Sequence, residues 1–164
     1  MPSRRLFAMN NNYHQKDKQG ICTVASLQWA KKCLQRRRGL GSFHELGLSA
    51  HQMNALMAVW RKHDDNPAIQ TQGMGLNIVG NDRPVTQFID VQRFTNFTAP
   101  HVCIFWTAGH TMGYRVSTAH GRECEFFDIE DGLWVADNDT DIQKTVMNNY
   151  GAGIQGMRII RLYA

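Results

Sequence analysis

The chain has 164 residues, of which 43% are hydrophobic and 20% are charged, and its formal net charge is +4. These values are ordinary for one soluble globular domain, and no apolar run approaches the ~20 residues that a membrane-spanning helix needs. The mild positive charge comes without a basic stripe that interleaves aromatic residues and without a known nucleic-acid module. We therefore expect no nucleic-acid partner.

The first 19 residues are polar and rich in asparagine, so we expect an N-terminal arm over 1–19 and a single domain over 20–164. A helix is predicted over about 20–38, because apolar residues recur there at helical spacing. A basic last turn followed by Gly39 is typical of the end of a helix. We expect Trp29 to anchor this helix by packing into the core.

A second helix is predicted to begin at Ser49, where Ser49 and Gln52 form the pattern of a capping box. It is predicted to end at residues 64–67, which read Asp-Asp-Asn-Pro. Residues 70–83 are rich in glycine, asparagine and glutamine and are expected to form a loop. The segment 82–94 is ambiguous between helix and strand.

The C-terminal half is predicted to be mainly β-structure, with one helix over 137–150. Strands are predicted at 101–107, 110–117, 123–129, 133–136 and 155–163. A helical first half followed by antiparallel strands indicates an α+β domain.

Cys22 stands out among the four cysteines, which lie at positions 22, 33, 103 and 124. No cysteine or histidine spacing is typical of a zinc site, so we expect no metal, no cofactor and free thiols in a reducing compartment. Cys22 follows a glycine and opens the first helix. The unpaired N–H groups and partial positive charge of a helix start favour the reactive thiolate. We therefore predict Cys22 as a nucleophile and the other three cysteines as core residues.

A catalytic thiol needs a base, and the base needs an orienting group. If residues 110–117 and 123–129 form a hairpin that turns near Ala119, His110 lies opposite Asp128 on the neighbouring strand. This pairing predicts His110 as the base and Asp128 as the orienting carboxylate. A register that differs by one residue would place them on opposite faces. His101 as the base and Asp131 as the carboxylate are the alternatives.

Three segments together resemble the YopT-like (YopT/AvrPphB) papain-fold cysteine peptidases, a family of bacterial effectors. The segments are Gly-Ile-Cys at 20–22 with Ser26 and Trp29, Gly-His-Thr-Met-Gly-Tyr at 109–114, and Phe-Phe-Asp at 126–128 followed by Gly132. The chain order Cys, His, Asp agrees with that of the family. Residues 129–130 are Ile-Glu, where the family has Pro-Asn.

The resemblance implies an α+β, papain-like fold whose catalytic cysteine, at the start of a helix, packs on a C-terminal antiparallel sheet. It implies a cysteine peptidase that uses Cys22, His110 and Asp128 and forms a thioester acyl-enzyme. Gln15, or alternatively Gln19, would complete the oxyanion hole. The expected substrate is a protein or peptide. A peptidoglycan amidase, or a deamidase or transglutaminase, is the alternative.

The resemblance also implies an effector or toxin that is made in the bacterial cytoplasm and acts inside a target cell. The basic start of the chain is followed by too few apolar residues for a secretory signal, so we expect export without one. Partners besides the substrate would be a secretion chaperone or an immunity protein. Contact of the arginines at 36–38 with a membrane is left open, and we expect a monomer.

Overall fold

The structure is a computed structural model, and it describes residues 3–8, 21–49, 51–53, 55–56, 67–97, 102–117, 123–150 and 153–162. The helices are α1 (Ile21–Arg36), η2 (Phe43–Leu46), α3 (Pro67–Gly73), α4 (Phe88–Phe97) and α5 (Asp139–Tyr150). The strands are β1 (Arg4–Ala8), β2 (Leu76–Arg83), β3 (Val102–Thr107), β4 (Thr111–Ser117), β5 (Glu123–Asp128), β6 (Gly132–Ala136) and β7 (Ile154–Leu162). In the described part of the chain, no helix has the length and apolar character to span a membrane.

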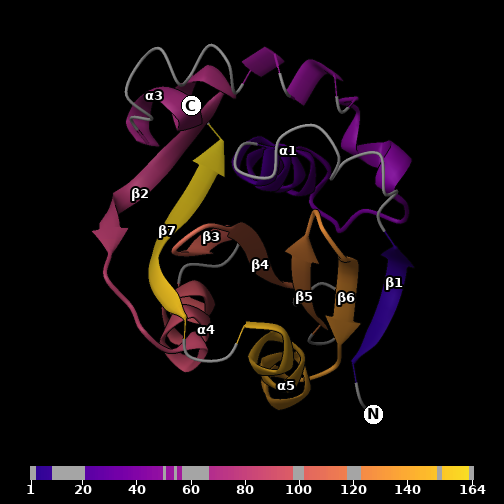
Figure 1. Cartoon of the computed structure of the whole chain (residues 1–164), viewed down its shortest axis with the longest axis vertical. Coiled ribbons are helices and arrows are strands. Elements are labelled where there is room, and N and C mark those ends of the chain that lie inside the picture. The colour runs from indigo at the N-terminus through magenta and orange to yellow at the C-terminus, as the bar shows by residue number, and fades with distance from the viewer. Residues whose placement is uncertain are drawn as a thin grey trace.

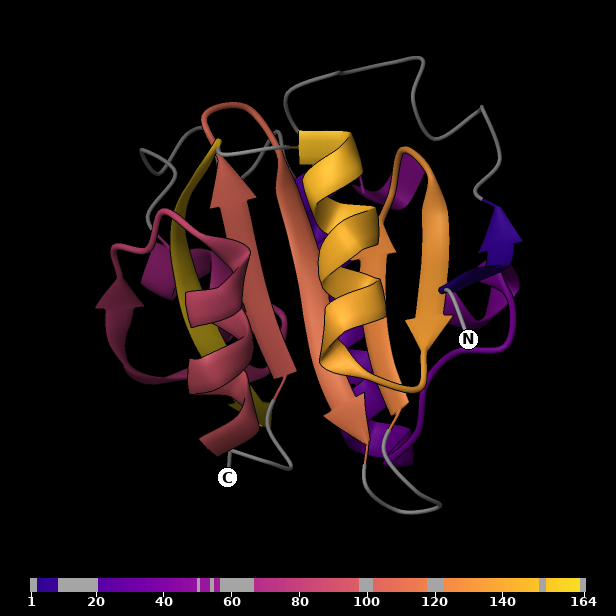
Figure 2. The same cartoon turned by 90° about the horizontal axis from the view of Figure 1, so that it is seen from below.

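A seven-stranded sheet in the order β1-β6-β5-β4-β3-β7-β2 forms the centre of the molecule. All neighbouring strands run antiparallel. Helix α1 covers one face of the sheet, and helices α4 and α5 cover the other (Figure 1, Figure 2). Each face has its own core, around Trp29 and Phe127 under α1 and around Phe88, Tyr114 and Phe126 under α4 and α5. This arrangement confirms the α+β class.

Helix α1 lies close to β4 because Gly113 has no side chain. A Cβ atom at Gly113 would lie 2.2 Å from Cζ3 of Trp29. The Trp29 ring is fully buried and stacks on Phe127, with 5.5 Å between the ring centroids, so its predicted packing role is confirmed. The Ser26 hydroxyl donates to the carbonyl oxygen of Thr111 at 3.1 Å. The first turns of α1 are therefore fixed against the start of β4.

Replacing Gly113 by alanine is expected to push α1 away from β4 and to lower the free energy of unfolding by about 1–3 kcal/mol, as overpacked cores do. Urea denaturation measures this change. Gly41→Ala is the matched control, because a Cβ there would lie 3.7 Å from Oε1 of Glu45, an ordinary contact. Equal unfolding midpoints for the two variants would contradict the close packing of α1 on β4.

Part of the expected N-terminal arm belongs to the sheet. Residues 4–8 form β1, which pairs with β6 at the edge of the sheet. Only Phe7 of this strand is half-buried, so its side chains carry no apolar alternation, and the pairing depends on backbone hydrogen bonds. The arm over 1–19 is thus an edge strand at these positions, and residues 9–19 lie outside the described residues.

The prediction of a loop over 70–83 is wrong. Helix α3 continues to Gly73, and β2 follows as the edge strand beside β7. Pro67 begins α3 instead of ending the helix before it, because proline suits the first helical position, where the N–H needs no partner. The polar residues of β2 lie at its exposed end, where the register with β7 shifts between Val79 and Arg83. An edge position tolerates such residues.

The other predicted elements agree with the structure to within a few residues. The ambiguous segment 82–94 is strand up to Arg83 and then helix α4. The capping box is confirmed, since the Ser49 N–H donates to Oε1 of Gln52 and the Gln52 N–H donates to Oγ of Ser49. Helical residues follow at 51–53 and 55–56, and the predicted end of this helix at 64–66 lies outside the described residues.

Candidate active site

Four segments meet at one end of the sheet. The β3–β4 connection carries His110, the β5–β6 turn follows Asp128, α1 begins at Ile21, and α5 ends at Tyr150. Figure 2 shows the β3–β4 connection, the β5–β6 turn and the end of α5 along the upper edge of the molecule in that view. Residues from both faces of the sheet thus reach the same place.

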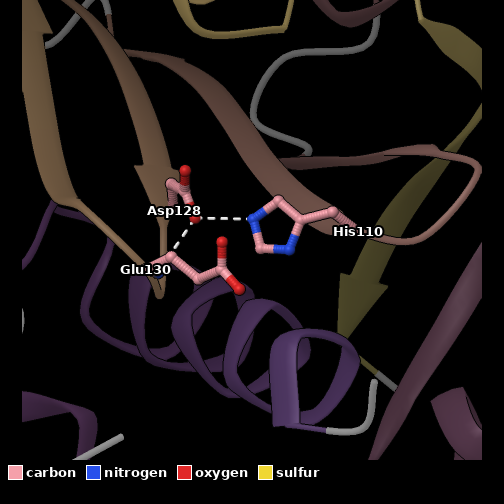
Figure 3. A group of neighbouring side chains, drawn as sticks. All are labelled: His110, Asp128 and Glu130. Atoms are coloured by element: carbon pink, nitrogen blue, oxygen red, sulfur yellow. Dashed lines mark hydrogen bonds and ion pairs between the residues drawn. The ribbon is translucent and has the colours of Figure 1, made fainter. Parts of the chain in front are cut away.

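His110 and Asp128 form a short hydrogen bond at this end of the sheet. The distance between Nε2 of His110 and Oδ1 of Asp128 is 2.6 Å (Figure 3). The contact arises from a register that differs from the predicted one, because β4 and β5 pair Ser117 with Glu123 and Gly113 with Phe127. The hairpin is therefore centred one residue later than expected, and His110 and Asp128 are offset by two residues from opposite positions. A shift of two residues keeps each side chain on its face, so the pair still meets.

The carboxylate of Asp128 is almost completely buried, with an exposed fraction of 1%. Its Oδ1 accepts a second hydrogen bond, from the backbone N–H of Glu130 at 2.9 Å. Its Oδ2 accepts a hydrogen bond from the hydroxyl of Tyr150. With both oxygens bonded, the carboxylate plane is fixed and one oxygen stays directed at His110.

Gly132 ends the turn that follows Asp128. Its φ is +143°, and a Cβ there would lie 2.1 Å from the carbonyl oxygen of Phe7 in β1. Only glycine adopts this conformation without strain, and only glycine allows β1 to approach so closely. The Gly132 that the sequence resemblance singled out therefore shapes the turn beside the carboxylate.

The surroundings of His110 favour its protonated form. Burial by itself lowers the pKa of His110, but the hydrogen bonds to Asp128 and Cys22 and the charges of these two groups raise it to about 10. Since Nε2 is bonded to Asp128, the nitrogen left for Cys22 is Nδ1. Figure 3 shows this second ring nitrogen turned toward helix α1. The imidazole therefore connects the carboxylate to the thiol.

Cys22 is the second residue of α1 and has an exposed fraction of 5%. Burial raises the pKa of its thiol, but hydrogen bonding to His110, the charge of His110 and hydrogen bonds from Thr111 outweigh it, so the pKa lies below its ordinary value. The charged forms of Cys22 and His110 stabilise each other. The arrangement favours the thiolate of Cys22 beside a protonated His110, and the thiolate is the form of cysteine that attacks electrophilic carbon.

Two of the other cysteines lack the contacts with His110 and Thr111 that favour the thiolate of Cys22. Burial raises the pKa of Cys33, and the nearby charge of Glu125 adds to this effect. Burial also raises the pKa of Cys103, to about 12. All four cysteines are buried, and none of them forms a disulfide. The difference in reactivity that the structure predicts therefore comes from the neighbours of each thiol and is unrelated to exposure.

The structure tests only some of the alternatives that the sequence left open. Asp131 accepts hydrogen bonds from Nε1 of Trp134 at 2.5 Å and from Nη1 of Arg5 at 3.2 Å, and His110 bonds to Asp128. His101, Gln15 and Gln19 lie outside the described residues. The side-chain donor of an oxyanion hole stays a prediction.

His110, Asp128 and Glu130 also form a set of metal-ligand types whose ligand atoms lie within 4.8 Å of one another (Figure 3). A divalent cation there would compete with existing bonds, because Oδ1 of Asp128 already accepts from His110 and from the Glu130 N–H. Its Oδ2 accepts from Tyr150. The hydrogen bonds match an oriented imidazole better than a cation site.

Tyr150 and Thr111 are parts of the site that sequence reasoning missed. Thr111 directly follows the predicted base, and its role depends on the packing of α1 against the start of β4. Tyr150 lies 22 residues after Asp128, at the end of a helix on the opposite face of the sheet from α1. No local pattern in the sequence signals such a contact.

No family model and no curated protein sequence matches this chain. Among solved structures, it is similar to PatoxP, a cysteine protease-like domain of the Photorhabdus asymbiotica toxin PaTox, with a TM-score of 0.55 and 12% sequence identity. The chain has the fold of a cysteine protease-like toxin domain. The match covers 93% of this chain but 52% of the other, so the chain spans about half the length of this structural neighbour. At this identity the likeness concerns the fold alone.

Proposed function

We propose that this chain is a papain-like cysteine peptidase in which Cys22 is the nucleophile, His110 the acid–base and Asp128 the group that orients His110. The observation that carries the proposal is the continuous connection from thiol through imidazole to carboxylate, with the pKa of Cys22 lowered and that of His110 raised. The fold that the chain shares with a cysteine protease-like toxin domain supports the same reading. Fold alone does not establish activity, so the proposal depends on the site.

The first half of the reaction forms a thioester. The thiolate of Cys22 attacks the carbonyl carbon of a scissile amide, and the C–S bond forms while the carbonyl oxygen becomes an oxyanion. The proton on Nδ1 of His110 passes to the departing nitrogen, the C–N bond breaks, and the amine leaves. Asp128 accepts the Nε2–H bond throughout and keeps Nδ1 directed at the sulfur.

The second half of the reaction restores the enzyme. Neutral His110 takes a proton from a water molecule, and the resulting hydroxide attacks the thioester carbonyl. The C–S bond breaks, the product leaves as a carboxylic acid that gives its proton to solvent, and thiolate and imidazolium are paired again. A complete cycle consumes one water molecule and leaves the protein unchanged, so neither a cofactor nor an oxidant enters the balance.

The first donor to the oxyanion in this proposal is the backbone N–H of Cys22. Cys22 is the second residue of α1, so its backbone N–H has no acceptor within the helix. Losing one such donor costs about 10²–10³ in rate in well-studied hydrolases. The second donor in this proposal is the side-chain amide of Gln15, with Gln19 as the alternative.

The proposed setting is that of a bacterial effector or toxin that acts on a protein of a target cell. The description of PatoxP as part of a toxin supports this setting. Export without a signal peptide, a secretion chaperone or immunity protein as partner, and a monomeric state belong to the same proposal. The reaction at the site is the same whether the amide belongs to a protein or to a cell-wall peptide.

The test compares the purified protein with Cys22→Ala, using Cys33→Ala as the matched control that removes a core cysteine. Each is incubated with a eukaryotic cell lysate and, separately, with purified peptidoglycan. The expected result is new protein N-termini in the lysate, detected by mass spectrometry, with the wild type and Cys33→Ala only. Soluble muropeptides would show an amidase, and a mass change without a cut would show deamidation or transglutamination. No Cys22-dependent product in either arm would contradict the proposal.

A further inference from the structure

Tyr150 is the last residue of α5, and it contacts two members of the proposed site from the opposite face of the sheet to α1. Its hydroxyl donates to Oδ2 of Asp128. Its ring stacks on His110, with 5.5 Å between the ring centroids and an interplanar angle of 22°. It also packs edge-on against Phe126 of β5, at 6.2 Å. The mechanism described above assigns no part to this residue.

The hydroxyl of Tyr150 restricts a rotation of the Asp128 carboxylate that the other hydrogen bonds of this group allow. The His110 ring and the Glu130 N–H both bond to Oδ1, so these two contacts hold one oxygen. The carboxylate could still turn about the bond that joins it to Cβ. A donor on Oδ2 prevents this rotation, because it fixes the second oxygen and therefore the plane of the group.

The ring of Tyr150 acts on His110 in a second way. His110 lies in the connection before β4, where its carbonyl oxygen accepts a hydrogen bond from the Thr107 N–H at 2.9 Å. This bond places the backbone but leaves the imidazole free to rotate about its side-chain bonds. An aromatic ring stacked on one face of the imidazole restricts its rotation, and offset stacking is a favoured geometry. With Nε2 held by Asp128 and one face covered by Tyr150, Nδ1 stays directed at Cys22.

Tyr150 also remains a donor under the conditions in which the thiolate is present. Burial raises the pKa of its hydroxyl, and the neighbouring charges of Asp128, Glu130 and Asp131 raise it further. Its proton is therefore retained across the range in which Cys22 is ionised and His110 is protonated.

We propose that Tyr150 is a positioning residue, which fixes the plane of Asp128 with its hydroxyl and the ring of His110 with its own ring. The proposal rests on the proposed function of Cys22. Helix α5 carries the tyrosine to the end of the sheet at which α1 presents the thiol.

The test removes the hydroxyl with Tyr150→Phe, and the hydroxyl together with the ring with Tyr150→Leu. Tyr114→Phe is the matched control, because the Tyr114 hydroxyl is also buried and donates to a carboxylate oxygen, Oδ1 of Asp139, at 3.1 Å. Two readouts are followed: the pH profile of Cys22 alkylation by iodoacetamide, and the pKa of His110 by NMR titration. The His110 signals are assigned with His110→Ala.

The expected result is a lower pKa of His110 in Tyr150→Phe and about tenfold slower alkylation of Cys22 near pH 6, the size expected for losing a hydrogen bond to a charged group. Tyr150→Leu is expected to lower both values further. Tyr114→Phe is expected to lower the unfolding midpoint but to leave the His110 pKa and the pH profile as in the wild type. A purely structural role for Tyr150 would give the same pattern as Tyr114→Phe.

Two outcomes overturn the proposal, and they are distinguishable. In the first, Cys22 is alkylated faster in the wild type than in His110→Ala, but Tyr150→Phe keeps the wild-type pH profile and His110 pKa. Tyr150 then does not position the site, and the proposed function stands. If the wild type and His110→Ala react at the same rate, both the activation of Cys22 and the role of Tyr150 are wrong.

Discussion

Replacing His110 by alanine is expected to lower kcat/KM for hydrolysis of an activated ester by about 10²–10⁴-fold, the usual contribution of a positioned acid–base group. His110 has two effects that the variant loses. It lowers the pKa of the buried Cys22 thiol, and it takes a proton from the water that hydrolyses the thioester. Without it, the hydrogen bonds from Thr111 remain, but they act against burial, which favours the neutral thiol. A p-nitrophenyl ester measures the rate without knowledge of the natural substrate.

The control for this variant is His51→Ala, since His51 is exposed at the start of the second helix. It is expected to hydrolyse the ester at the wild-type rate. Circular dichroism shows whether His110→Ala keeps its secondary structure. Hydrolysis at the wild-type rate by a folded His110→Ala would contradict the role given to His110.

Replacing Asp128 by alanine is expected to have an effect of similar size, about 10²–10⁴-fold on the same rate, as loss of the orienting carboxylate has in serine hydrolases. The raised pKa of His110 depends on its hydrogen bond to Asp128 and on that charge, so we expect the His110 pKa to fall. The variant also leaves the Tyr150 hydroxyl and the Glu130 N–H without their acceptor. We therefore expect a loss of about 1–3 kcal/mol in the free energy of unfolding, which urea denaturation measures.

Asp128→Asn separates the charge from the shape. It keeps the size of the side chain and an acceptor oxygen, so its unfolding midpoint is expected to lie closer to that of the wild type, while the rate stays low. Asp90→Asn is the control for a carboxylate away from the site. Asp90 is half-exposed, and its Oδ1 lies 3.9 Å from Nη1 of Arg93. An Asp128→Asn variant with the wild-type rate would show that the charge of Asp128 is not needed.

The sequence predicted those parts of the fold that a regular side-chain pattern specifies. The apolar stripe of α1 and the alternation of the later strands were visible as periodicity, and the capping box at Ser49 has a direct local mechanism. The two edge strands were missed for a common physical reason. β1 is mostly exposed and the far end of β2 is polar, so backbone pairing with β6 and β7 positions them without an apolar pattern.

The contact between His110 and Asp128 was predicted from a register that was wrong by two residues. The prediction of contact survived because two residues is the repeat of a strand, and an error of one residue would have separated the pair. Tyr150 had no comparable signal. Its contact depends on how α5 packs across β5, and that packing is a tertiary property which neither spacing nor composition encodes locally.

The most direct test of the central claim, that His110 keeps Cys22 as a thiolate, is the rate of iodoacetamide alkylation of each cysteine from about pH 5 to pH 11. Peptide mass spectrometry reports the four sites separately in one sample. Because the pKa of Cys22 is lowered and that of His110 is raised to about 10, the Cys22 rate is expected to level off at a lower pH than for an ordinary cysteine. It is expected to change again only as His110 loses its proton.

In His110→Ala, the Cys22 rate is expected to rise continuously with pH, about tenfold per pH unit below the pKa of the thiol, as for an ordinary cysteine. Cys33 and Cys103, whose pKa values are raised by burial, are expected to react slowly throughout in both proteins. A wild-type Cys22 whose rate rises with pH in the same way as that of His110→Ala would contradict the activation of Cys22 by His110.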